Sequence, residues 1–325
     1  MFRFVLPWVC GAAWLSAQTP LSGPSLGYVY DAQSQALRPL TGIPGAAYFA
    51  APLATPLAIG SAAFSLRQNI AVVNNGTWNA LMLSPSGVTG TVNLPGSLPA
   101  NARVELSETG SAAAFYDATN SALTVITGIT AGAPAANGVS LDSLPGAITK
   151  FAVGDDGSLL LASAMSGGGE GLFWAGQDGS LLQLATMQST ASILLWNAGA
   201  NALLTDRGAS QIWQIQSPGN QAAITLLASA ADGVAGPVGA ALSSDGSQLW
   251  IANEGNQNVL GINLATRATL SLPCGFHLAT LLPMTDGTSF RLNHAGKGPM
   301  WMLDTSPTSG PRIVFVPAMI TEVSQ

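Results

Sequence analysis

Charged residues are scarce in this chain. Only 8% of its 325 residues are Asp, Glu, Lys or Arg, and lysine occurs just twice, at Lys150 and Lys297. The formal net charge is −6, and the few basic residues form no stripe that could neutralise a phosphate backbone. We therefore expect no nucleic-acid partner. Ser, Thr, Asn, Gln and Gly must cover much of the surface, because a typical soluble domain carries far more charge.

Histidine and cysteine are equally rare, with two of each. Two histidines cannot form a three-histidine metal centre, and the sequence contains no nucleophile elbow, zinc-protease helix or phosphate-binding loop. Cys274 lies just before His277 in the chain, but two ligands do not make a zinc site. We interpret the pair as a buried thiol and a hydrogen-bonded imidazole. We expect neither a metal nor a cofactor.

The N-terminus has the pattern of a secretory signal peptide. Arg3 precedes a short apolar run at residues 4–15, and Ala17 supplies a small residue at the cleavage site. We therefore predict a signal peptide over residues 1–17 and a mature protein in the periplasm or outside the cell. An uncut anchor helix is disfavoured, because the run is shorter than the ~20 residues of a membrane span. Lipidation of Cys10 is disfavoured, because the residues just before it are not the small ones that processing prefers.

What the chain does contain is a repeat. Its clearest copy is Pro237–Leu272, in which turns separate four short strand-like stretches. The first turn is Ser244-Asp245-Gly246-Ser247, where glycine tolerates positive φ and the Asp and Ser side chains bond to nearby backbone. Equivalent turns recur at intervals of roughly 41 to 47 residues, and such a period with four strands per unit is typical of a β-propeller. Helices are disfavoured, because Gly, Pro, Asn and Ser interrupt nearly every window.

Six complete units predict six four-stranded blades, and the N-terminal region decides the total. The units cover roughly Ser61–Ser97, Ala102–Leu144, Ile148–Ala185, Ala191–Leu227, Val238–Leu272 and Ala279–Pro317. Residues 26–30 and 36–40 supply two more strands, either as the outer pair of a seventh blade or as a hairpin packed on a six-bladed ring. We favour seven blades. The prediction is an all-β propeller of four-stranded antiparallel blades in one domain, residues 18–325.

One segment imitates a membrane helix. Residues 44–66 carry no charge, but Pro52, Pro56 and Gly60 interrupt them. We interpret the stretch as a connection between blades and expect no membrane span after signal cleavage.

The clearest repeat also resembles a known family. Its Ser243-Ser244-Asp245-Gly246 turn, its Leu249-Trp250-Ile251 strand and the Ala252-Asn253 pair match the pattern of the YVTN and lactonase-like (NHL-like) propeller repeats of exported bacterial proteins, and Val259–Thr266 continues it. The close match covers one blade, and the Gly-His and Trp-Asp marks of WD40 blades are absent. The resemblance implies the architecture, because propellers of this type have binding, structural and catalytic roles.

The antiparallel order of strands assigns each loop to one end of the ring. If strands A to D run from the axis outward, the A–B and C–D turns form one end, the first rim, and we interpret its short turns as structural. The B–C loops and D–A crossovers form the other end, the second rim, where the scarce charges collect. Binding residues come disproportionately from loops on a rigid frame, so the candidates are Asp206, Arg207, Glu254, Arg291, His294 and Lys297.

Each candidate has an alternative interpretation as a solvated or blade-stabilising side chain. The inner strands are mostly apolar and small, Glu105 and Glu108 aside. This composition disfavours a channel lined with calcium ligands.

Two functions of different classes remain. The first is an exported, non-catalytic and monomeric propeller that acts as a binding or scaffold module, with an unknown protein or small ligand on the second rim. The second is a lactonase- or lyase-like hydrolase, in which His294 is the general base and Arg291 or Arg207 steadies an oxyanion. The second function requires His294, Arg207 and Glu254 to face a common pocket. We favour the first.

Overall fold

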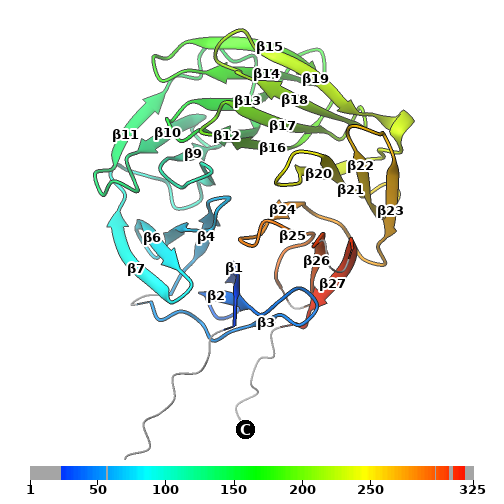
Figure 1. Ribbon diagram of the computed structural model, residues 1–325. Coiled ribbons are helices and arrows are strands. Elements are labelled where there is room, and N and C mark those ends of the chain that lie inside the picture. The colour runs from blue at the N-terminus through cyan, green and yellow to red at the C-terminus, as the bar shows by residue number, and fades with distance from the viewer. Residues whose placement is uncertain (1–22, 56–57, 297, 307–309, 319–325) are drawn as a thin grey trace, which may run out of the picture.

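The computed structural model is a ring of seven antiparallel sheets around a central axis (Figure 1). It describes residues 23–55, 58–296, 298–306 and 310–318. The ring confirms the predicted seven-bladed all-β propeller. The expected signal peptide and Lys297 lie outside the described residues. Within the described ranges, the one helical element is a short 3-10 turn, η1 (Ala230–Asp232). No helix in these ranges is long and apolar enough to cross a membrane.

The strands of each sheet follow one another in sequence order, with the first strand nearest the axis (Figure 1). Blade 1 comprises β1 (Ser25–Asp31), β2 (Ala36–Thr41) and β3 (Tyr48–Phe49). Blade 2 comprises β4 (Ser61–Phe64), β5 (Ile70–Asn74), β6 (Trp78–Ser84) and β7 (Gly87–Asn93). Blade 3 comprises β8 (Arg103–Leu106), β9 (Ala113–Asp117), β10 (Ala122–Thr127) and β11 (Ala135–Val139). Blade 4 comprises β12 (Ile148–Val153), β13 (Leu159–Ala164), β14 (Glu170–Ala175) and β15 (Leu181–Met187).

The remaining three blades have the same four-stranded form. Blade 5 comprises β16 (Thr190–Trp196), β17 (Asn201–Asp206), β18 (Gln211–Gln216) and β19 (Ala223–Ala228). Blade 6 comprises β20 (Pro237–Leu242), β21 (Gln248–Asn253), β22 (Asn258–Asn263) and β23 (Thr269–Pro273). Blade 7 comprises β24 (Leu282–Pro283), β25 (Ser289–Arg291), β26 (Met300–Asp304) and β27 (Arg312–Val316).

Asp156 and Asp245, two carboxylates of the first rim, hold their own turns. Asp156 accepts hydrogen bonds from N and Oγ of Ser158 at 2.9 and 2.5 Å, and Asp245 accepts the same pair from Ser247 at 3.0 and 2.9 Å. Hydrogen bonds from the hydroxyl of Ser243 and then from Ser247 lower the pKa of Asp245 to about 2, because they stabilise the ionised form. These side chains therefore serve the turns, as the sequence predicted.

The core is divided into seven apolar clusters, one between each pair of neighbouring blades. Between blades 2 and 3, for example, Trp78 meets Phe115 edge to face with ring centroids 5.2 Å apart. Because each blade buries apolar side chains against two neighbours, the ring is closed by packing all the way round.

Blade 1 differs from the others in the direction of its first strand. β1 begins at the first rim, where the Leu26 carbonyl accepts a hydrogen bond of 3.1 Å from the amide of Thr285, in the A–B turn of blade 7. It ends at the second rim, where the Tyr30 hydroxyl donates to the carbonyls of Ile59 and Gly60 at 2.6 and 2.9 Å, at the entry to β4. β1 therefore runs in the direction of a B strand. β1, β2 and β3 take the B, C and D places.

The expectation that residues 26–30 and 36–40 form an outer pair is therefore wrong. They are the B and C strands, and no strand of the described residues takes the inner place. The side chain of Gln68, from blade 2, occupies part of that place. Its Oε1 accepts a 2.5 Å hydrogen bond from the Tyr28 amide. Gly27 makes room for it, because a Cβ at its φ of 131° would lie 2.1 Å from the same oxygen.

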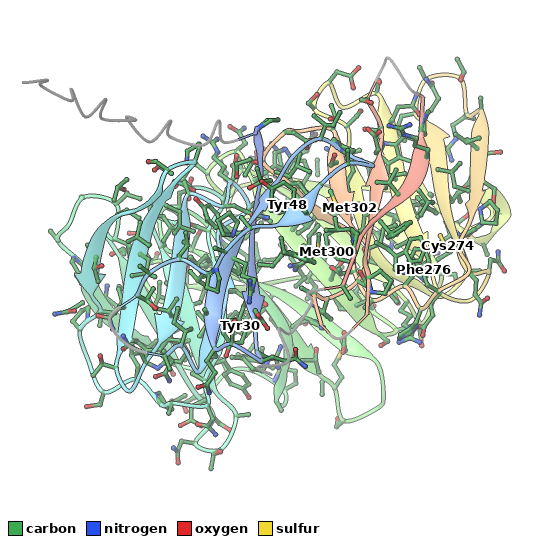
Figure 2. The ribbon with its side chains drawn as sticks, turned by 90° about the horizontal axis from the view of Figure 1, so that it is seen from below. Tyr30, Tyr48, Cys274, Phe276, Met300 and Met302 are labelled. Carbon is green, nitrogen blue, oxygen red and sulfur yellow. The ribbon has the colours of Figure 1, made fainter. Side chains whose placement is uncertain are left out.

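The junction between the first and last blades is built mainly from side chains. Met284, Met300 and Met302 pack against β1 and β2 in one buried cluster with Leu26, Val29 and Leu40, and Figure 2 shows Met300 and Met302 beside the first blade. Gln68 Nε2 lies 3.7 Å from the sulfur of Met284, so blades 2 and 7 meet across blade 1. Among the described residues, the first and last blades are thus joined without a shared sheet.

Candidate functional site

Asp206 is a structural residue of the second rim. Its side chain is buried, and its carboxylate accepts hydrogen bonds from the backbone amides of Gln188, Ser189 and Ala209 at 2.8, 3.1 and 3.0 Å. Three amide donors satisfy most of what the carboxylate can accept, so Asp206 holds the crossover into blade 5 in place.

Its neighbour Arg207 belongs to an exposed ionic group. Arg207 donates to Glu254 Oε2 at 2.5 Å, and Nδ1 of His277 lies 3.3 Å from Glu254 Oε1. The three side chains come from the B–C loops of blades 5 and 6 and from the crossover into blade 7. The side chains of Arg207 and His277 are 54% and 73% exposed, against 29% for Glu254. The group therefore links neighbouring elements of the second rim at the surface.

Aromatic side chains continue this group over blade 7. The rings of Phe276 and Trp301 stack with centroids 4.3 Å apart and planes at 3°, and Phe315 tilts against Trp301 at 5.4 Å. Phe315 is 51% exposed. Glu254, Phe276 and His277 line a shallow cavity of 440 Å³. We call Arg207, Glu254, Phe276, His277, Trp301 and Phe315 the second-rim patch.

The cysteine before this patch lies apart from its histidine. Cys274 is buried, and its thiol donates to the Leu272 carbonyl at 3.6 Å, whereas His277 turns to Glu254. Figure 2 shows Cys274 and Phe276 close together on this side of the molecule. Burial raises the pKa of the thiol. Both observations agree with a structural thiol.

Arg291 and His294 line a different cavity, at the axis of the ring. This central cavity has a volume of 450 Å³ and is lined by the inner strands of blades 2 to 7. Arg291 ends β25 and His294 follows in the B–C loop of blade 7, so both lie toward the second rim. Burial, and then the positive charge of Arg291, lower the pKa of His294. Its imidazole is therefore neutral at pH 7.

Glu105 and Lys150 line the same central cavity from β8 and β12. Water reaches the Glu105 carboxyl from the cavity, but the surrounding protein replaces much of its solvation. This desolvation raises the pKa of Glu105 to about 7, with partial opposition from the positive charges of Lys150 and Arg103. From the sequence, Glu105 stands out as an exception on an inner strand but is not assigned to a site, and Lys150 is not singled out as a site residue. The available signal was a charged residue inside an apolar inner strand.

The four ionisable groups of the central cavity are unpaired. Among the residues described by the structure, Glu105, Lys150, Arg291 and His294 make no hydrogen bond or ion pair, and Arg291 Nε is buried without a partner. The other arginines in these ranges are all engaged: Arg38 with Asp31, Arg67 with Glu108, Arg207 with Glu254, Arg267 with Asp232, Arg312 with Asp304, and Arg103 with the carbonyls of Ile148 and Thr149. The central cavity is thus where the chain leaves charge unsatisfied.

The geometry does not assemble the site that the alternative function, a hydrolase, requires. His294 lines the central cavity, whereas Glu254 lines the separate cavity at the second rim and holds Arg207. The required common pocket is therefore not formed by these three residues. In the part of the chain that the structure describes, no group of three or more His, Cys, Asp or Glu side chains is placed to hold a metal ion.

Comparison with known proteins identifies the fold. No protein-family model and no curated protein matches the sequence. A functionally unknown protein from Desulfotomaculum acetoxidans superimposes with a TM-score of 0.55 and 13% identity, over 90% of this chain and all (100%) of its own. A protein from Lactobacillus plantarum superimposes with a TM-score of 0.55 and 16% identity, over 90% of this chain and 96% of its own. A candidate 6-phosphogluconolactonase from Bacteroides fragilis superimposes with a TM-score of 0.54 and 11% identity, over 90% of this chain and 97% of its own.

At identities this low, the likeness concerns architecture alone. It defines the class of the protein as a seven-bladed all-β propeller, similar in structure to lactonase-like propellers and to proteins of unknown function.

Proposed function

We propose that this protein is an exported, non-catalytic propeller of the YVTN or lactonase-like type that binds a partner protein on its second-rim patch. The observation that carries the proposal is the composition of this patch. In a chain with 8% charged residues, it combines an exposed ionic group with a row of three aromatic rings, in which Trp301 contacts the other two. Aromatic side chains and arginine are the residues that dominate binding energy at protein interfaces.

The distribution of the remaining ionisable groups supports a binding role. The carboxylate of Asp206 accepts hydrogen bonds from three backbone amides. Asp156 and Asp245, in turns of the first rim, bond to serines of their own turns. The second rim is also where the rigid ring presents its B–C loops and crossovers, the elements from which binding residues are usually drawn. Export rests on the signal-peptide pattern of residues 1–17.

Affinity capture with matched variants tests the binding role. The mature chain is immobilised, mixed with periplasmic extract and cross-linked, and the captured proteins are quantified by mass spectrometry. Arg207→Gln and Phe276→Ala are compared with Arg67→Gln. The control is matched, because Arg67 is also an exposed arginine paired with a glutamate, but on the first rim (62% exposed, Arg67–Glu108 2.8 Å).

We expect a protein that the wild type and Arg67→Gln capture equally and that both patch variants lose, with thermal unfolding changed by less than about 1 kcal/mol for an exposed ion pair. Capture that is the same for all four proteins, or that recovers nothing reproducible, overturns the proposal. Export is tested separately, by fractionation and by N-terminal sequencing of the mature protein, which we expect to begin at Gln18.

A further inference from the structure

We propose that the central cavity is a second binding site, which takes a small organic monocarboxylate through Arg291. This site is distinct from the second-rim patch and does not depend on the proposed protein partner. The starting observation is the isolation of the guanidinium. Arg291 Nε is the one charged atom among the buried side-chain polar atoms that lack a partner within the described ranges, and the others are a hydroxyl and two indole nitrogens.

Arg291 is partly exposed to the central cavity, but its Nε is buried without a partner. Such a guanidinium is costly, because desolvation favours its neutral form and no counter-ion compensates for the loss. The same desolvation lowers the pKa of Arg291, although arginine stays protonated at neutral pH. Every other arginine of the described residues makes an ion pair or donates to carbonyls. A planar carboxylate is the group that satisfies a guanidinium fork with two parallel hydrogen bonds.

The charge of the cavity selects the class of anion. At the blade 7 side, Arg291 contributes one positive charge and His294 is neutral, because its pKa is lowered. At the blade 3 and 4 side, Lys150 and Glu105 attract each other and largely cancel when Glu105 is ionised. At pH 8, where Glu105 with its pKa of about 7 is mostly ionised, one negative charge therefore neutralises the site. A phosphate monoester, with a charge near −2, would exceed this and would also be repelled by Glu105.

The size and the lining of the cavity add a second requirement. A volume of 450 Å³ lies in the range of small-molecule sites and exceeds what a carboxylate group fills. Lys150 and Glu105 offer a donor and an acceptor to the far end of the ligand. We therefore infer a carboxylate with neutral polar groups, such as hydroxyls, along its chain.

Isothermal titration calorimetry with defined probes tests this site. The probes are gluconate, glucose, lactate and inorganic phosphate. Glucose matches gluconate in its hydroxyl groups but lacks the carboxylate. We expect gluconate or lactate to bind, glucose not to bind, and phosphate to bind at least tenfold more weakly than the better carboxylate. Arg291→Gln is expected to weaken carboxylate binding by about 10- to 100-fold, as for the loss of charge-assisted hydrogen bonds.

Two controls keep the result unambiguous. Arg67→Gln, on the first rim, must leave carboxylate affinity unchanged. Arg291→Gln must retain or raise the melting temperature, because it removes an unpaired charge. If that variant does not fold, His294→Gln replaces it. We expect this variant to bind the carboxylate about threefold more weakly or worse, because the imidazole beside Arg291 is replaced by an amide.

Any one of four results would overturn the inference. The first two are that the wild type binds no carboxylate at concentrations up to about 10 mM, or that it binds glucose as well as gluconate. The other two are that it binds phosphate more tightly than either carboxylate, or that Arg291→Gln retains full affinity. A failure here would leave capture at the second-rim patch unaffected, since the two sites use different residues and different assays.

Discussion

Replacing Glu105 by glutamine is expected to stabilise the protein at alkaline pH and to have little effect at acid pH. The loss of solvation inside the cavity raises the pKa of this carboxyl from 4.5 to about 7 in the folded protein. Below 4.5 the group is protonated in the folded and the unfolded chain alike. Between 4.5 and 7 only the folded chain keeps the proton, so stability falls as the pH rises, and the full penalty is present above 7. Glutamine is neutral throughout and does not carry this penalty.

The size of the effect follows from the shift. At 1.36 kcal/mol per pKa unit, a rise from 4.5 to about 7 corresponds to at most about 3 kcal/mol. Water in the cavity screens the carboxylate, and the variant also loses the attraction between Glu105 and Lys150, so we expect a net gain of about 1 kcal/mol at pH 8. In a domain of this size the melting temperature then rises by roughly 2 °C.

Thermal unfolding of the wild type and Glu105→Gln at pH 4.5, 6, 7 and 8 measures this difference. Glu108→Gln is the control, because Glu108 lies in the same blade but pairs with Arg67, and its replacement is expected to bring no gain at pH 8. The reasoning is refuted if the gain of Glu105→Gln is independent of pH or is larger at pH 4.5 than at pH 8.

Two further predictions concern packing. Gly27→Ala is expected to lower the free energy of unfolding by about 2 to 4 kcal/mol. The φ of 131° is strained for alanine, and the new Cβ, 2.1 Å from Gln68 Oε1, would displace that side chain and break its bond to the Tyr28 amide. Gly246→Ala, with φ 71° and no atom within 4 Å, should cost only about 1 kcal/mol in the same urea titration. Similar costs for the two variants would contradict the close approach. The Cys274 thiol, buried and with a raised pKa, should react with iodoacetamide at pH 8 far more slowly in the folded than in the urea-unfolded protein, and equal rates would show that it is accessible.

The blades could be predicted because their signals are local. A turn such as Ser243–Ser247 needs only its own residues to form, and its recurrence gives the period and the order of strands. The direction of β1 could not be predicted, because it depends on contacts with Thr285 and Gly60 from other blades. Such contacts between blades are not visible in the sequence, so the expectation of an outer strand pair had no support from them.

The candidate site, too, could be predicted only in part. Topology predicted that Arg207, Glu254 and His294 lie toward the second rim, but not which of them share a cavity. The contact between Glu254 and His277 and the isolation of Arg291 depend on where side chains point across several blades. A single sequence carries no such information, although a charge within an apolar inner strand, as at Glu105, is a usable sign.

The side-chain junction between the first and last blades makes the ring sensitive to oxidation. Met284, Met300 and Met302 are buried there, at 4%, 0% and 0% exposure, and they supply much of the apolar surface that joins β1 to blade 7. Conversion of a thioether to a sulfoxide would place a polar group in this cluster. In the part of the chain that the structure describes, no shared sheet holds the two blades together. An oxidant that reaches these methionines during a local opening would therefore leave the ring parted at this junction, with the other six blade contacts intact.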